Sequence, residues 1–112
     1  TGANLLVNLT NDAWYGKSVG PWQHARLAQS RAIETRRSLL RVTNTGVTSV
    51  VNAKGELVES LPMFVPDVLR AQVDILDGQT YYVRYGDWFA WGMTITTAAI
   101  LLFGLNRASM VR

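Results

Sequence analysis

The residues that could do chemistry in this sequence crowd into one stretch, residues 8–24. The stretch combines amide, carboxylate, aromatic and imidazole side chains: Asn11, Asp12, Trp14, Tyr15 and His24. An apolar run at residues 5–7 precedes it, and Pro21 is well placed in the first turn of a following helix. Binding pockets of α/β proteins are often built where a strand ends and a helix begins. We therefore predict a polar and aromatic pocket here, the alternative for any single ring being a lid on the core.

Complete catalytic machinery is missing from these residues. The chain has no Cys, which excludes a thiolate nucleophile and a thiolate metal site within it. His24 has no Cys partner, no serine has the spacing of a nucleophile elbow, and no glycine-rich phosphate loop occurs. A lone histidine is more often structural than a base or a metal ligand. The residues alone predict a binding pocket with no cofactor, no metal and no catalytic residue of its own.

The elements that must position this pocket follow from the apolar pattern. The first strand is predicted at residues 4–10, and its continuous Leu-Leu-Val run predicts burial on both faces of a sheet. A helix over residues 21–37 comes next. The remaining strands and their turn are predicted by alternation and by Gly, Asn and Pro breaks: strands at 39–43, 47–52, 57–61 and 68–76, and a hairpin turn at 52–56.

The predicted helix has two distinct kinds of surface. Small side chains at Ala25, Ala28 and Ala32 form one stripe, which would let the helix lie close on a sheet. The arginines lie mostly away from that stripe, and a solvated face is the expected place for them: Arg26, Arg31, Arg36 and Arg37.

Composition indicates one globular domain with an additional apolar segment. The chain has 112 residues, is 48% hydrophobic and carries a net charge of +3, which argues against disorder. A mild basic excess is compatible with anionic lipid or nucleic acid, but the strand-rich body argues against nucleic acid. The sequence starts without Met, three residues before a strand that reads as buried. We interpret it as the C-terminal piece of a longer protein.

The last apolar segment, residues 88–105, carries no charge and predicts a membrane span. At about 1.5 Å per residue it reaches about 27 Å, close to the ~30 Å hydrocarbon core. Aromatic residues form a belt at one end: Tyr81, Tyr82, Tyr85, Trp88 and Trp91. Arg107 and Arg112 follow the other end, which predicts a cytoplasmic C-terminus with residues 1–87 on the outer face. The alternative is a buried helix of a soluble protein.

Four strings of this sequence resemble the apolipoprotein N-acyltransferases, bacterial inner-membrane enzymes of the carbon–nitrogen hydrolase (nitrilase) superfamily. The strings are Asn-Asp-Ala-Trp-Tyr-Gly at 11–16, Gly-Pro-Trp-Gln-His at 20–24, Arg-Ala-Ile-Glu at 31–34 and Leu-Arg-Val-Thr-Asn-Thr-Gly at 40–46. The resemblance continues through residues 80–88 and covers nearly the whole chain. It implies an α/β fold that is part of a nitrilase-like α-β-β-α sandwich, followed by one C-terminal transmembrane helix.

The resemblance also implies a reaction, with the catalytic residues upstream of residue 1 and part of the substrate pocket in this chain. In this family a Cys thiolate takes an acyl chain from a phospholipid as a thioester and passes it to the N-terminal diacylglyceryl-cysteine of a lipoprotein, with a Glu as base and a Lys at the oxyanion. These three residues lie upstream of residue 1, so the fragment alone is expected to be inactive. The match assigns a substrate pocket to Trp14, Tyr15, Asn11, Asp12 and His24. Tyr15 stands where Phe is usual in the family.

The implied layout has four parts. They are the C-terminal part of a carbon–nitrogen hydrolase domain (1–80), a juxtamembrane aromatic linker (81–87), a transmembrane helix (88–105) and a cytoplasmic tail (106–112). The implied partners are a phospholipid acyl donor, a diacylglyceryl lipoprotein acceptor and the bacterial inner membrane, with the catalytic domain on the periplasmic face. Two alternatives stay open: a membrane-tethered amidase of the same superfamily, and a non-enzymatic membrane-anchored binding module.

Overall fold

The computed structural model describes residues 2–110, with side chains in the last helix described as far as residue 104. The chain forms two compact units, Thr1–Thr80 and Tyr81–Arg112. Each unit is considered by itself below.

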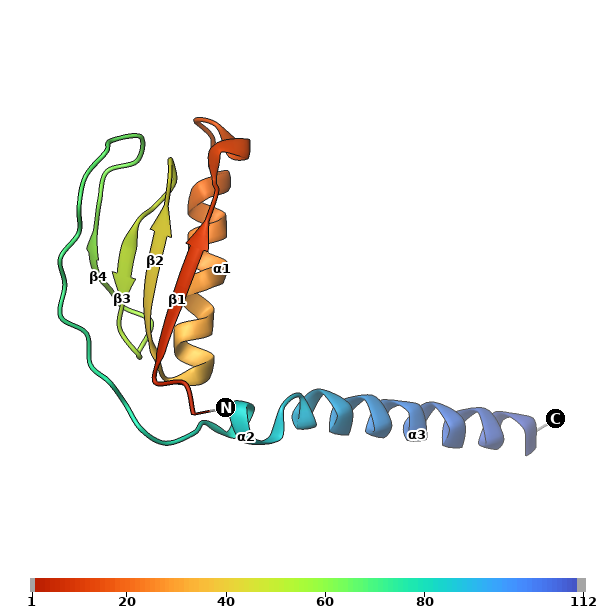
Figure 1. The fold of residues 1–112 in the computed structure, drawn as a ribbon. Helices are drawn as coiled ribbons and strands as arrows, with labels where there is room; N and C mark the ends of the chain where they lie inside the picture. The colour runs from red at the N-terminus through yellow and green to blue at the C-terminus, as the bar shows by residue number, and fades with distance from the viewer. Residues whose placement is uncertain (1, 111–112) are drawn as a thin grey trace. The chain divides into compact units, whose positions relative to one another are not determined.

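A four-stranded mixed sheet and one long helix make up the first unit (Figure 1). The elements are β1 (Leu5–Thr10), a 3-10 turn η1 (Ala13–Tyr15), α1 (Gly20–Thr35), β2 (Ser38–Thr43), β3 (Ser49–Val51) and β4 (Leu57–Ser60). The strand order is β1-β2-β3-β4; β1 and β2 are parallel, and the other two pairs are antiparallel. Helix α1 is the crossover between the two parallel strands, so the loop after β1 and the loop after β2 meet at one end of the sheet.

The core lies between α1 and the sheet. Ala32 of α1, Leu39 of β2 and Val51 of β3 are buried together, and Leu6 and Ala28 pack against them. The small side chains of Ala28 and Ala32 let the helix approach the strands closely. The predicted small-residue stripe is therefore confirmed at these two positions.

The opposite face of the sheet is apolar and open. Val7 and Leu9 of β1 are 58% and 75% exposed, and Val42, which pairs with Leu9, is 47% exposed. The prediction that the first strand is buried on both faces is therefore wrong for the described residues. Side chains alternate across a strand, so only every second residue of β1 faces α1.

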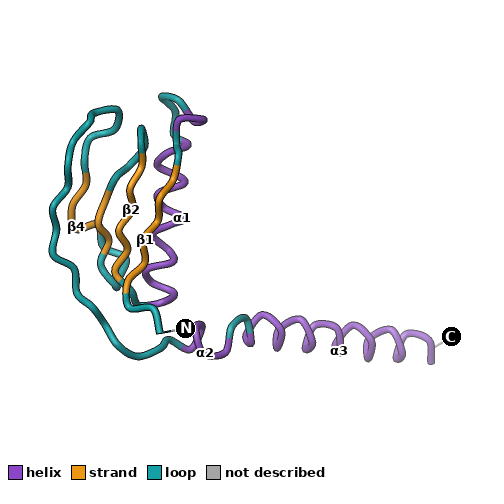
Figure 2. Tube along the Cα trace, viewed as in Figure 1, coloured by secondary structure: helices purple, strands orange, loops and turns teal. Residues whose placement is uncertain are grey.

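The predicted strand at residues 68–76 does not form. Residues 61–80 run as a loop from β4 to the end of the unit (Figure 2). The carbonyl groups of this loop accept hydrogen bonds from side chains instead of from a neighbouring strand; Ser38 Oγ, for example, donates to Asp74 O at 2.9 Å. The loose alternation of residues 68–76 is a weak strand signal, and side-chain donors satisfy backbone carbonyls in place of a neighbouring strand.

Arg37 departs from the predicted solvated face of the helix. Its side chain is nearly buried, with 8% of the residue exposed. The guanidinium donates to the carbonyl oxygens of Ala3, Arg36 and Gly78. Arg37 lies after the end of α1 and ties the start of the chain to the long loop, so it is structural rather than solvated.

Two helices make up the second unit, α2 (Tyr81–Tyr85) and α3 (Trp88–Met110). Across the part of the chain that the structure describes, no helix combines the length and the apolar character needed to cross a bilayer. The predicted membrane span at residues 88–105 is therefore not supported. The helix continues through most of the predicted tail, and residues 111–112 lie outside the described part.

We predict that Leu39→Ala lowers the free energy of unfolding by about 2–5 kcal/mol, because it leaves a cavity between α1 and the sheet. Leu27→Ala is the matched control: Leu27 lies on α1 and is 69% exposed, so its truncation should change stability by about 0.5 kcal/mol or less. Denaturant unfolding of the two variants measures the difference. Equal losses would show that the core is elsewhere.

Candidate functional site

A buried ion pair lies where β1 ends. Asp12 is fully buried, Arg41 of β2 is 1% exposed, and Arg41 Nη2 donates to Asp12 Oδ2 at 2.8 Å. Arg41 Nη1 also donates to the side-chain oxygen of Asn8 at 2.6 Å. Asn8 and Arg41 are register partners in the parallel pair β1–β2, so both side chains point to the face that α1 covers. The parallel pairing therefore places the Arg41 guanidinium next to the turn that follows β1.

His24 completes the cluster from α1. Its Nδ1 lies 2.9 Å from Asp12 Oδ1 and 3.1 Å from Arg41 Nη2. A guanidinium nitrogen can only donate. We assign the tautomer with hydrogen on Nδ1, because Asp12 Oδ1 then accepts from His24 while Oδ2 accepts from Arg41. In that form Nε2 is the acceptor nitrogen of the ring.

The backbone of the same turn is tied to the loop after β2. Asn44 Oδ1 accepts from the backbone N–H of Asp12 at 3.0 Å, and Asn44 Nδ2 donates to Asn11 Oδ1 at 2.8 Å. Asn11 Oδ1 also accepts from the N–H of Ala13 at 3.0 Å. A Cβ atom on Gly46 would lie 2.1 Å from Asp12 Oδ2, so the approach of the two loops requires glycine there.

The two aromatic residues of the turn lie differently. Trp14 is 87% exposed and projects from η1. Tyr15 is 43% exposed, and the centre of its ring lies 5.8 Å from that of His24. A Cβ atom on Gly20 would lie 2.4 Å from the Tyr15 ring, so this ring lies directly against the start of α1. The structure brings Asn11, Asp12, Tyr15 and His24 together, and leaves Trp14 free of contacts that would fix it as core.

The sequence analysis missed the residues that hold this turn in place. Local patterns give Arg41 and Asn44 only as members of the resembling string at 40–46, and give Asn8 no polar role. The available signal is the spacing of Arg41, two residues after Leu39, which puts both side chains on the same buried face of β2. A buried arginine needs a carboxylate partner.

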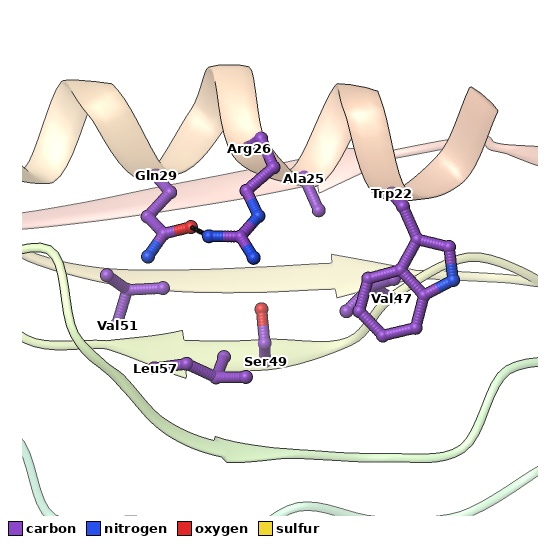
Figure 3. Close-up of a pocket in the computed structure, with 8 residues that line it drawn as sticks. All are labelled: Trp22, Ala25, Arg26, Gln29, Val47, Ser49, Val51 and Leu57. Carbon is purple, nitrogen blue, oxygen red and sulfur yellow. Dashed lines mark hydrogen bonds between the residues drawn. The ribbon is translucent and has the colours of Figure 1, made fainter. Parts of the chain in front are cut away.

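A separate small cavity of about 70 Å³ lies between α1 and the strands β3 and β4 (Figure 3). Its lining is Trp22, Ala25, Arg26, Gln29, Val47, Ser49, Val51 and Leu57. It contains none of the predicted pocket residues and no carboxylate, thiol or imidazole, so it offers neither a general base nor a metal ligand. Within the described residues, no group of three His, Cys, Asp or Glu side chains could hold a metal ion.

The sequence of the chain matches a known family. Residues 1–82 match the family model of carbon–nitrogen hydrolases, and the chain belongs to this family. Its curated relatives are named apolipoprotein N-acyltransferase. The chain is 40% identical to the protein of that name from Geobacter metallireducens over 97% of this chain and 21% of the relative. It is 43% identical to that from Shewanella oneidensis over 95% of this chain and 20% of the relative, and 40% identical to that from Haemophilus ducreyi over 90% and 20%.

These comparisons confirm the resemblance to apolipoprotein N-acyltransferases and to the carbon–nitrogen hydrolase superfamily. The mixed α/β sheet is consistent with that fold. The chain spans about a fifth of the length of the curated relatives it matches. It therefore corresponds to one part of proteins whose other parts it does not contain.

We predict that Arg41→Leu lowers the free energy of unfolding by about 3–5 kcal/mol, because it leaves the buried Asp12 carboxylate without its cation. Arg26→Leu is the control: Arg26 is exposed, lines the small cavity under α1, and donates a long hydrogen bond to Gln29 at 3.5 Å without pairing with a buried charge. That substitution should change stability by about 0.5 kcal/mol or less. Thermal unfolding of both variants provides the comparison, and a tolerated Arg41→Leu would mean that the ion pair contributes little.

We also predict that Gly46→Ala weakens the site by displacing the Asp12 carboxylate from Arg41. The expected cost in unfolding free energy is about 1–3 kcal/mol, typical of an overpacked buried site. Gly2→Ala serves as control, since a Cβ atom there meets nothing within 4 Å. A crystal structure of the Gly46→Ala protein with Asp12 and Arg41 unmoved would contradict this reading of the contact.

Proposed function

We propose that this chain is the C-terminal part of an enzyme that moves an acyl chain from a phospholipid to the N-terminal diacylglyceryl-cysteine of lipoproteins. The observation that carries the proposal is the similarity to proteins named apolipoprotein N-acyltransferase over 97% of the chain. The site geometry supports it. A large exposed ring, Trp14, stands on a turn built around buried charges, at the end of the sheet where ligands bind in α/β proteins.

The proposed reaction has two half-reactions. A thiolate sulfur attacks the ester carbonyl of the phospholipid and forms a thioester, and the departing lysophospholipid oxygen takes a proton from the protonated general base and leaves as an alcohol. The lipoprotein α-amine then attacks the thioester carbonyl, an amide forms and the thiolate leaves, while the amine proton goes to a general base. Because this chain holds no Cys, the nucleophile would come from the residues that precede it, and the fragment by itself would be inactive.

Within that reaction this chain would supply the wall of the substrate pocket. Trp14 would contact the acyl chain, each methylene it covers contributing about 0.8 kcal/mol. Tyr15 and His24 would form the adjoining surface, and Asn11 and Asp12 would hold the turn. The extra hydroxyl of Tyr15 in place of the usual Phe adds a polar group beside an acyl chain.

We also propose that the protein works at the bacterial inner membrane with residues 1–80 on the periplasmic side. The support is the apolar surface of the second unit, where large side chains are exposed: Trp88, Phe89, Trp91, Ile95, Ile100, Leu101 and Phe103. Exposed tryptophan and tyrosine rings favour the interface between lipid and water. An acyl donor that resides in the bilayer would be reached most readily from such a position.

Two alternatives remain open to experiment. A membrane-tethered amidase of the same superfamily would pass the acyl group to water instead of to an amine. The full-length protein, given phospholipid and a diacylated lipopeptide, distinguishes them: N-acylated peptide supports the transferase, and free fatty acid without N-acylation supports the amidase. A coding sequence with no Cys in the few tens of residues before Leu5 would instead favour a non-enzymatic membrane-anchored binding module.

In the full-length protein, we predict that Trp14→Ala lowers kcat/KM for N-acylation about tenfold or more and leaves the folded protein's stability nearly unchanged. The loss corresponds to two covered methylenes, and an 87% exposed ring contributes little to the core. Trp22→Ala is the matched control: Trp22 lines the cavity under α1, so its truncation should affect stability more than acyl transfer. Parallel losses of expression and activity in Trp14→Ala would make Trp14 a structural residue.

A further inference from the structure

Asp12 and Arg41 form no bond to the substrate in the proposed reaction, and both are almost fully buried. Asp12 is fully buried, and protein groups take the place of water at each of its polar atoms. The carboxylate oxygens Oδ1 and Oδ2 lie against His24 and Arg41. The backbone N–H donates to Asn44, and the carbonyl accepts from the N–H of Tyr15 at 3.1 Å. Every polar atom of this residue has a partner. Such complete pairing fixes a residue in one geometry.

Asp12 holds the turn at one end, and Tyr15 holds it at the other. The Tyr15 ring lies against the start of α1, and its centre is 5.8 Å from that of the His24 ring, with the two planes tilted by 55°. His24 therefore lies beside both ends of the turn, with its Nδ1 at Asp12 and its ring next to that of Tyr15. Trp14 stands between these two fixed points and has no comparable anchor of its own, being 87% exposed.

His24 differs from the other members of the cluster in being accessible. Its side chain is 33% exposed, whereas those of Asp12 and Arg41 are 0% and 1% exposed. The negative charge of Asp12 and the positive charge of Arg41 neutralise each other without His24, so replacement of His24 leaves the net charge of the buried pair at zero. His24 can therefore be substituted without leaving a buried charge unpaired.

We propose that His24, acting through Asp12 and Tyr15, is a positioning residue that fixes the orientation of Trp14 and thereby sets how the site discriminates among acyl chains of different length. The inference rests on the proposed acyl-transfer function. A Trp14 ring held in one orientation contacts each additional methylene of a long acyl chain, and every such methylene raises kcat/KM about fourfold. A Trp14 ring that can reorient loses that contact, and kcat/KM then depends less on the length of the acyl chain.

The test compares His24→Leu with His24→Asn in the full-length protein. Leu has similar bulk but no donor, whereas the Asn amide nitrogen reaches the position of Nδ1 and can donate to Asp12. For each variant, kcat/KM is measured with phospholipids of long and short acyl chains and a diacylated lipopeptide. Hydrogen exchange of the Tyr15 and Gly16 amides, which donate to Asp12 O and Ala13 O, is measured on the same samples.

For His24→Leu we expect the ratio of kcat/KM for long over short chains to fall at least about fourfold, with faster exchange at Tyr15 and Gly16. His24→Asn should restore both the ratio and the slow exchange. Arg26→Gln, on the same helix but exposed and outside the site, should change neither. This pattern would not arise from a general loss of stability, which lowers the rate equally for all chain lengths.

An unchanged chain-length ratio in His24→Leu, or unchanged exchange at residues 15 and 16, overturns the proposal. So does a failure of His24→Asn to restore what His24→Leu loses. If the wild-type protein shows no N-acylation at all, the proposed function fails separately. The exchange measurement then decides alone whether His24 holds the turn.

Discussion

The buried pair of Asp12 and Arg41 is the interaction on which the geometry of the site depends. Two opposite charges removed from water are stable only when both are well paired, so each fixes the other. Here the cation comes from β2 and the anion from the turn after β1, and their contact requires the parallel register that aligns Asn8 with Arg41. Sheet pairing, the crossover of α1 and the shape of the turn are thereby linked through one contact.

The architecture was largely accessible from the sequence, and the site only in part. The strand at residues 5–7, the small residues Ala28 and Ala32 against the sheet, and the hairpin around Gly55 each follow from local rules and form as expected. Only the predicted burial of that strand on both faces is wrong. The pairing of Asp12 with Arg41 was inaccessible because the two residues are separated by 29 positions. It depends on which strands are neighbours, a property that no local pattern carries.

Two of the errors have a common physical origin. The strand predicted at 68–76 and the solvated role predicted for Arg37 both concern the long loop before the second unit. In that loop, Arg37 and Ser38 donate to backbone carbonyls at Gly78 and Asp74, so side chains replace the hydrogen bonds that a strand would have made. Strand propensity describes the local preference of the backbone for an extended, paired conformation. Here the side chains of Arg37 and Ser38 bond to the loop carbonyls and favour an irregular conformation instead.

The open face of the sheet has a practical consequence for work with residues 1–112 by themselves. Val7 and Leu9 of β1 and Val42 of β2 form an exposed apolar strip, and the outer edge of β1 has no neighbouring strand within the described residues. An unpaired strand edge beside an apolar strip favours pairing with the same edge of a second copy. Concentrated solutions of this polypeptide are therefore prone to aggregate through β1.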